Sequence, residues 1–143
     1  MRKWTSEEDI LAGLIQCGYK LFNLAIDKYN TEDYKESLKC YNAIFDIIPL
    51  DTEDQLKRGN ITKETIYMNS YLATSKIKDN KQSKEFLQKL IDINFNEPDI
   101  FRYMSSILYE EGKSEEALMY LSTGREMFED DQSLLNAEIN LYI

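Results

Sequence analysis

The chain has 143 residues, enough for one domain with a buried core, and 43% of them are hydrophobic and 30% charged, as in ordinary globular proteins. Its 26 acidic and 17 basic residues leave a net charge of -9. Because an acidic surface repels both phosphate backbones and anionic lipid, we expect no nucleic-acid partner and no adsorption to membranes.

The apolar runs and the N-terminal sequence bear on location. No apolar run approaches the roughly 20 residues that a bilayer requires, so no direct membrane insertion is expected. Glu7, Glu8 and Asp9 precede the apolar part of the first segment, which is the reverse of the order in a secretory signal peptide. The sequence predicts a cytoplasmic location. A periplasmic or envelope-associated location is expected if the chain is a piece of a longer exported protein.

The pattern along the chain predicts helices throughout. Thr5 and Glu8 fit a capping box, and apolar residues then recur at helical spacing to about Tyr29. With 2 Pro and 5 Gly, the chain has few helix breakers. We predict about seven helices, over residues 5–29, 34–48, 63–78, 83–93, 98–111, 114–128 and 132–143. Residues 52–63 are predicted to be a polar connector with room for one helical turn.

Short polar turns join these helices in pairs, in the segments "YNTEDYKESL", "IKDNKQSKEFL" and "YEEGKSEEAL". Turns this short make the two helices antiparallel neighbours. In the last of them, Gly112 is expected to let the chain leave one helix and Ser114 to cap the next. Thr62 and Pro98 are expected to start two others.

The turns also repeat at a fixed interval. Ser83 and Ala117 occupy equivalent places in two of them, and the interval between the two residues is that of a helix-turn-helix repeat of about 34 residues. In this the chain resembles the tetratricopeptide repeat family. Unit 98–131 carries the family's pattern most fully, at Phe101, Met104, Ser105, Leu108, Gly112, Ala117 and Leu121.

The resemblance implies an all-α fold, in which antiparallel helix-turn-helix repeats stack as a short right-handed superhelix (an α-solenoid). Residues 1–143 would form one domain. Its parts would be an extended first repeat, a connector, a second repeat, a third repeat, and a capping or partial fourth-repeat helix, over residues 5–51, 52–63, 64–97, 98–131 and 132–143. Small residues in contact, Ala25 with Ser37 and Ser105 with Ala117, would let paired helices approach closely.

The sequence offers little for catalysis. It contains no histidine and no glycine-rich phosphate loop, and its acidic clusters lie at helix starts and turns, where they stabilise the helix dipole. The two cysteines, Cys17 and Cys40, have neither disulfide-framework nor metal-site spacing. We therefore expect no enzyme activity, no cofactor and no metal.

In the tetratricopeptide family the first helix of each pair lines a concave surface that binds partners. Carried over by position, the resemblance implies a groove that consists of Tyr19, Phe22, Ile26, Met68, Asn69, Leu72, Arg102, Tyr103 and Tyr109. An alternative interpretation for Phe22 and Ile26 is simple burial against the connector or the N-terminal helix. Of the positions with which some family members clamp the C-terminal carboxylate of heat-shock chaperones, Asn69 alone matches, so this function is rejected.

Two functions follow from the resemblance. The first is a non-catalytic protein-protein interaction module, with a scaffold or assembly role, that binds a peptide or protein segment on the concave face. The alternative is a small acidic cytosolic secretion chaperone of the tetratricopeptide type that holds a hydrophobic client segment. Both predict a protein or peptide partner.

Overall fold

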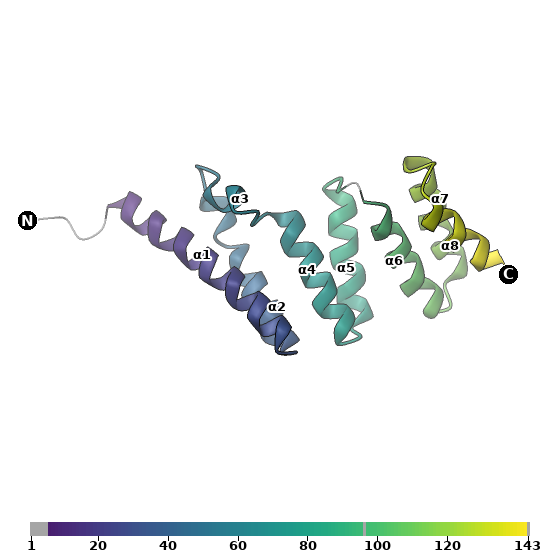
Figure 1. Cartoon of the computed structure of the whole chain (residues 1–143), viewed down its shortest axis with the longest axis horizontal. Helices are drawn as coiled ribbons and strands as arrows, with labels where there is room; N and C mark the ends of the chain where they lie inside the picture. Colours follow the sequence, from purple (N-terminus) through teal and green to yellow (C-terminus); the bar gives the residue numbers. More distant parts are fainter. Residues whose placement is uncertain (1–5, 96, 143) are drawn as a thin grey trace, which may run out of the picture. The chain divides into compact units, whose positions relative to one another are not determined.

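The computed structural model describes residues 6–95 and 97–142, and in these ranges the chain folds into eight α-helices and one 3₁₀ helix with no strand. The predicted all-α fold is confirmed, and each of the seven predicted segments is a helix (Figure 1). In chain order the helices are α1 (Glu7–Asn30), α2 (Tyr34–Ile44), η1 (Ile48–Leu50), α3 (Gln55–Arg58), α4 (Lys63–Lys76), α5 (Asn80–Asp92), α6 (Pro98–Glu110), α7 (Ser114–Met127) and α8 (Gln132–Tyr142).

The chain divides into two compact units, the first ending at Asp79 and the second beginning at Asn80. In the first unit, α1 and α2 form an antiparallel pair, α4 packs on α2, and α3 packs on α1 (Figure 1). Their apolar faces share one core cluster, which consists of Ile15, Ala25, Cys40, Tyr41, Ile44, Ile47, Leu56, Ile61 and Ile66.

In the second unit, α6 and α7 form an antiparallel pair, α5 packs on α6, and α8 packs on both members of the pair. Phe101, Leu121 and Leu134, one from each of α6, α7 and α8, form the core between these three helices. Gly124 allows this approach, because a Cβ there would lie 2.9 Å from Phe101 Cβ.

The turns that follow α1, α4 and α6 have the same backbone structure. Each has one residue with a left-handed backbone, Glu32, Lys78 and Gly112. In each, the amide of the next residue reaches back five positions, as from Lys113 N to Leu108 O at 2.9 Å. The interval from Lys78 to Gly112 equals that from Ser83 to Ala117, whereas the interval from Glu32 to Lys78 is longer.

A second set of equivalent turns explains the connector. Asn60 and Asn94 are also left-handed, are separated by the same interval, and end α3 and α5 with the same pair of backbone hydrogen bonds. Helix α3 therefore corresponds to the last turn of α5. The chain segment from Glu32 to Asn60 is longer than the corresponding segment from Lys78 to Asn94. It forms three separate helices, α2, η1 and α3.

Several helix ends differ from the predictions. The predicted cap Thr5 lies outside the described residues, and the Ser6 hydroxyl caps α1 by accepting the Asp9 amide at 3.1 Å. The predicted cap Ser114 is wrong. The carbonyl of Lys113 accepts the first α7 hydrogen bond, from Ala117 N at 3.0 Å, so Ser114 is already inside the helix.

Two other helix boundaries also differ from the predicted ones. Helix α5 begins at Asn80 rather than Ser83, because the turn at Lys78 closes with the bond from Asp79 N to Thr74 O. Helix α2 ends at Ile44, since tight i→i+3 bonds take over from Phe45 onward. The expected starts at Thr62, which caps α4, and at Pro98 are confirmed.

The backbone at two glycines predicts opposite effects of the same substitution. Gly112 has φ +80°, so Gly112→Ala should destabilise the chain by about 1–2 kcal/mol although its Cβ meets nothing. Gly13 lies inside α1 with open space around it, so Gly13→Ala should stabilise the chain by about 0.5–1 kcal/mol. Urea unfolding followed by circular dichroism measures both, and changes of the same sign would contradict the assigned turn.

Candidate functional site

The predicted groove residues belong to α1, α4 and α6, and the structure places some of them in two pockets, one in each unit. The pocket in the first unit, the unit-1 pocket, encloses about 180 Å³. It is lined by Ile26, Tyr29, Tyr41, Asn69 and Leu72. The predicted residues Ile26, Asn69 and Leu72 thus come together.

The unit-1 pocket is mainly apolar and open to solvent. Ile26 is 36% exposed and Leu72 is 40% exposed, although both are large aliphatic side chains. Exposed aliphatic and aromatic side chains that converge around a hollow are typical of a site that receives an apolar side chain of a partner.

The floor of this pocket is polar at one point. The Tyr41 hydroxyl accepts a hydrogen bond from Asn69 Nδ2 at 3.1 Å. Tyr41 is 2% exposed, and burial raises the pKa of its phenol. The Phe22 ring meets the Tyr41 ring edge-on, with centroids 6.0 Å apart. Phe22 thus supports the floor instead of lining the hollow.

Tyr41 was not among the residues predicted to line the site. It lies on the second helix of a pair, whereas members of the tetratricopeptide family bind partners through the first helix of each pair. Its separation from Asn69 along the chain matches no period of the repeat. The one available hint was its large polar aromatic side chain in the apolar stripe of α2.

The other predicted residues of the first unit do not line the pocket. The Tyr19 hydroxyl donates a hydrogen bond to the Gln55 carbonyl, and its ring covers Gly59, so Tyr19 packs on the α3 segment. Phe22 is half-buried and packs on the core cluster, where its ring contact is with Tyr41 of α2 rather than with the connector, whereas Ile26 remains exposed. Met68 is half-buried on α4.

The pocket in the second unit, the unit-2 pocket, encloses about 550 Å³ between α6, α7 and α8. It brings together the three predicted residues of α6, namely Arg102, Tyr103 and Tyr109. Its other lining residues are Ser105, Ser106, Leu121, Ser133, Asn136, Ala137, Asn140 and Leu141. Most of these side chains can form hydrogen bonds, so this pocket offers polar partners beside its apolar surface.

Arg102 is the charged residue of the unit-2 pocket, and its charge is partly neutralised. Its Nη2 lies 2.8 Å from Asp99 Oδ1, and its guanidinium carbon lies 5.1 Å from the centre of the Tyr103 ring. The hydrogen bond to Asp99 raises the pKa of Arg102. Its Nε is buried without a hydrogen-bond partner among the described residues. The Arg102 side chain is therefore fixed by its neighbours, and its charge is only partly available to a partner.

Within residues 6–95 and 97–142, no group of three or more His, Cys, Asp or Glu side chains could hold a metal ion. In the same ranges no helix is both long and apolar enough to cross a bilayer.

The chain is similar to solved structures, but it matches no known family in sequence. No family model matches the chain, and no curated protein matches it in sequence. The crystal structure of PcrH in complex with the chaperone binding region of PopB is similar, with a TM-score of 0.58 and 13% identity over 98% of this chain and 97% of that one.

The structure of the Yersinia enterocolitica type III secretion translocator chaperone SycD is also similar, with a TM-score of 0.56 and 14% identity. That match covers 87% of this chain and 84% of SycD. At such low identity the likeness shows a shared fold. The chain thus has the all-helical fold found in the structures of PcrH and SycD.

Proposed function

We propose that this chain is a non-catalytic protein that binds a segment of another protein, and that the unit-1 pocket receives an apolar side chain of that segment. The observation that carries the proposal is the exposure of Ile26 and Leu72 around a hollow whose floor is the buried Tyr41, hydrogen-bonded to the half-buried Asn69. A side chain that enters this hollow removes two exposed aliphatic residues from water, which is the main source of affinity in such contacts.

We also propose that the chain is a tetratricopeptide repeat protein. The support is local: left-handed turn residues recur at the repeat interval of about 34 residues, at Asn60 and Asn94 and at Lys78 and Gly112. The small residues expected where paired helices approach are buried, with Ser37 and Ala25 each 0% exposed. The boundaries of the individual repeats remain a prediction.

A second candidate function is that of a secretion chaperone that holds a hydrophobic client segment. The favouring observation is the likeness to PcrH, which was crystallised with the chaperone binding region of PopB and matches over almost the full length of both chains. If the chain is a secretion chaperone, the unit-1 pocket again receives an apolar side chain of the partner, and the partner is a client protein before its export. The net charge of -9 suits such a role, because charge keeps a client-bound complex soluble.

The test of the pocket is a binding measurement with peptides selected from a displayed random-peptide library. We expect Ile26→Asp to weaken a selected peptide by at least about tenfold, because its carboxylate would lose water against an apolar side chain. Leu24→Asp is the matched control, since Leu24 lies on the same helix, is 44% exposed and is not part of the pocket. Equal weakening by both variants, or no enriched peptide, would contradict the proposal.

The two candidates separate with a defined probe, a peptide of the chaperone binding region of PopB. Binding of this peptide, and its loss in Ile26→Asp, is expected for a secretion chaperone. Enrichment of library peptides without binding of the PopB peptide favours the general interaction protein.

A further inference from the structure

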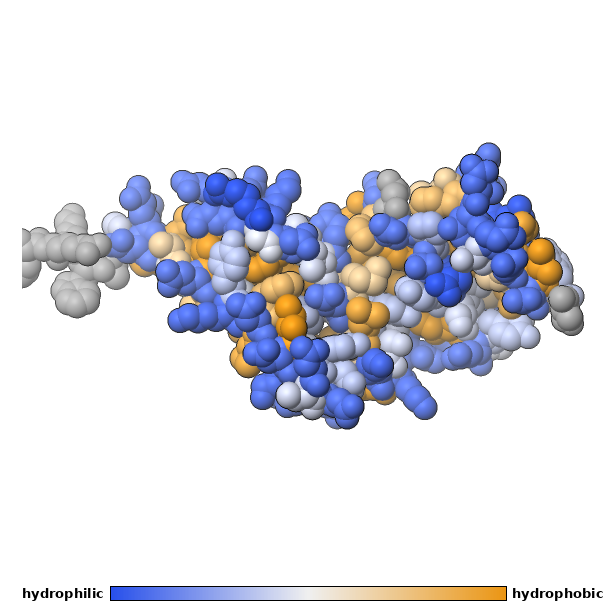
Figure 2. Space-filling view, viewed as in Figure 1, coloured by the Kyte–Doolittle hydropathy of each residue, from blue (hydrophilic) through white to orange (hydrophobic). Residues whose placement is uncertain are grey.

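The unit-1 pocket has the size of one aromatic ring. It encloses about 180 Å³, and a protein cavity of about 150 Å³ lined by aliphatic and aromatic side chains holds one benzene molecule. Sites for free small molecules usually enclose about 300 Å³ or more, so such a ligand would be poorly enclosed here. Figure 2 shows hydrophobic surface in the region where Figure 1 places α1 and α4, the helices that carry Ile26 and Leu72. The pocket therefore suits a ring that a partner segment carries.

Two aromatic side chains line this pocket, and each is held by a ring behind it. The Tyr41 ring contacts the Phe22 ring edge-on, and the Tyr29 ring contacts the Tyr34 ring edge-on, with centroids 5.2 Å apart. Aromatic rings attract one another in edge-on and offset arrangements beyond what the burial of their surface contributes. An entering ring would gain these contacts from Tyr29 and Tyr41, which are already in position, whereas an aliphatic side chain would not. The lining therefore favours an aromatic side chain.

The floor of the pocket can form more hydrogen bonds than it does. A tyrosine hydroxyl and a primary amide each have both a donor and an acceptor. Among the described residues, one hydrogen bond joins the two groups, from Asn69 Nδ2 to the Tyr41 hydroxyl, and the Asn69 carbonyl oxygen and second N–H bond no other group. A flipped amide would also leave a donor and an acceptor on this floor. The floor can therefore bind the polar end of a side chain.

We propose that the side chain received by the unit-1 pocket is a tyrosine of the partner segment, whose ring fills the hollow and whose hydroxyl bonds the Tyr41–Asn69 pair. This inference rests on the proposed function and narrows it to one residue type. The partner hydroxyl donates to Asn69 Oδ1 and accepts from the Tyr41 hydroxyl, which replaces the hydrogen bonds that it made to water. A phenylalanine would fill the same space but would leave the floor unpaired.

The lining also disfavours the other polar side chains. Within the described residues the pocket is lined by aliphatic, phenol and amide groups, and none of these is ionised at neutral pH. A carboxylate, an ammonium or a guanidinium would therefore lose its water without meeting an opposite charge. Serine, threonine and asparagine could bond the floor, but they carry no ring to fill the hollow or to contact Tyr29.

Paired peptides test the choice of tyrosine. Peptides selected from a displayed random library should share a tyrosine, and its replacement by phenylalanine should weaken binding about tenfold in calorimetric titration. Asn69→Leu and Tyr41→Phe each remove part of the floor, so each should shrink this difference to less than about threefold. Asn42→Leu is the matched control, because Asn42 is exposed on α2 outside the pocket, and it should keep the full difference.

The outcomes separate this inference from the function on which it rests. Peptides that lose binding in Ile26→Asp but bind equally well with phenylalanine, or share no tyrosine, would overturn the choice of tyrosine and leave the proposed function intact. A tyrosine preference that persists in both Asn69→Leu and Tyr41→Phe would overturn the role of the floor. Without any enriched peptide, or with peptides insensitive to Ile26→Asp, both the function and this inference would be overturned.

Side-chain analogues supply a second readout that needs no selected peptide. p-Cresol and toluene have the rings of tyrosine and phenylalanine, and the methyl resonances of Ile26 and Leu72 report their entry into the pocket by NMR. We expect p-cresol to bind at least about fivefold more tightly than toluene, although toluene is the more hydrophobic of the two, and Asn69→Leu to remove this preference. Toluene binding as tight as that of p-cresol would overturn the inference.

Discussion

Leu56→Ala is expected to destabilise the first unit by about 2–5 kcal/mol, the range for removing a fully buried leucine from a core. Leu56 is 1% exposed and belongs to the same core cluster as Ile15 and Ile47. It lies against α1 at Gly18, where an added Cβ would be 3.0 Å from Leu56 Cδ2. Loss of the side chain leaves a cavity that the short α3 cannot fill by moving, because the neighbouring turns are hydrogen-bonded on both sides.

Two hydrogen-bonded turns hold α3 in place. The Asp51 carboxylate accepts the amides of Gln55 and Leu56 at 2.9 and 2.8 Å, and the Ile61 amide returns to the Leu56 carbonyl at 2.9 Å. Hydrogen exchange at Ile61 therefore reports the opening of α3 directly, and it should become faster in Leu56→Ala.

Leu50→Ala is the matched control, because Leu50 belongs to the same lengthened path between α1 and α4 but is 44% exposed. A truncation on the surface should change the free energy of unfolding by less than about 0.5 kcal/mol. Urea unfolding measures this free energy for both variants. If Leu56→Ala cost no more than Leu50→Ala, α3 would not be part of the folded core.

The paired helices could be predicted from the sequence because their signals are local. Polar turns, the helical spacing of apolar residues and residues such as Gly112 and Pro98 act on the backbone within a few positions. The same is true of Ser37, whose small size indicates a close helix contact before any partner is known. The repeat interval then relates one pair to the next without any tertiary information.

The structure of the connector could not be predicted in this way. The segment "DTEDQLKRGNIT" is mostly polar and has two aliphatic side chains, Leu56 and Ile61, and both are buried. Their spacing fits neither a helical nor a strand period. Whether these two side chains are buried therefore depends on how the connector packs on α1. This packing also explains why Tyr19 lies against α3 rather than in the predicted groove.

The candidate site was partly predictable for the same reason. Positions on first helices follow from the repeat, and these positions led to Ile26, Asn69 and Leu72. Tyr41 reaches the pocket through the packing of α2 on α4, which depends on where two helices cross. A crossing point of this kind is set by all the side chains between the helices, and no short motif records it.

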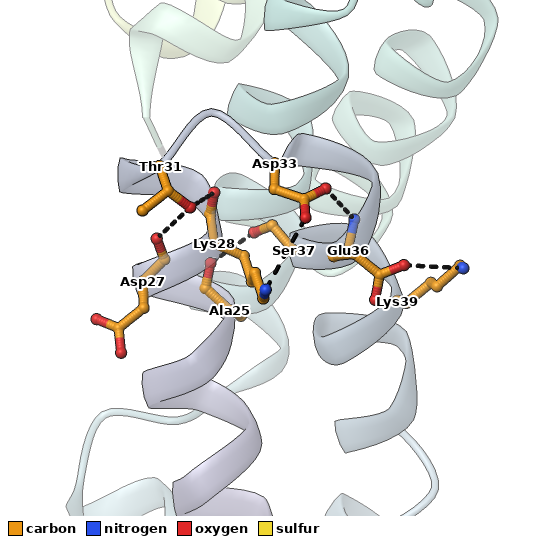
Figure 3. A network of polar contacts seen from close by, with 8 residues as sticks. All are labelled: Ala25, Asp27, Lys28, Thr31, Asp33, Glu36, Ser37 and Lys39. Carbon is orange, nitrogen blue, oxygen red and sulfur yellow. Dashed lines mark hydrogen bonds and ion pairs between the residues drawn. The ribbon is translucent and has the colours of Figure 1, made fainter.

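Ser37→Ile is expected to destabilise the α1–α2 pair by about 3 kcal/mol, through overpacking and the loss of a buried hydrogen bond. The Ser37 hydroxyl donates to the Ala25 carbonyl at 2.7 Å, and both residues are fully buried (Figure 3). Around them, the turn between the helices is held by the Asp33 cap on the Glu36 amide. The extra carbons of isoleucine have no space unless α2 moves away from α1.

Two further variants separate the two causes. Ser37→Ala removes the hydrogen bond and adds no volume, so it should cost about 1 kcal/mol. Ser75→Ile makes the same change on the exposed side of α4, so it should cost little, because serine and isoleucine have similar helix propensities. The difference between Ser37→Ile and Ser37→Ala in urea unfolding then measures how closely the helices approach. If this difference were no larger than the cost of Ser75→Ile, the small residues at 25 and 37 would not be the reason that α1 and α2 pair.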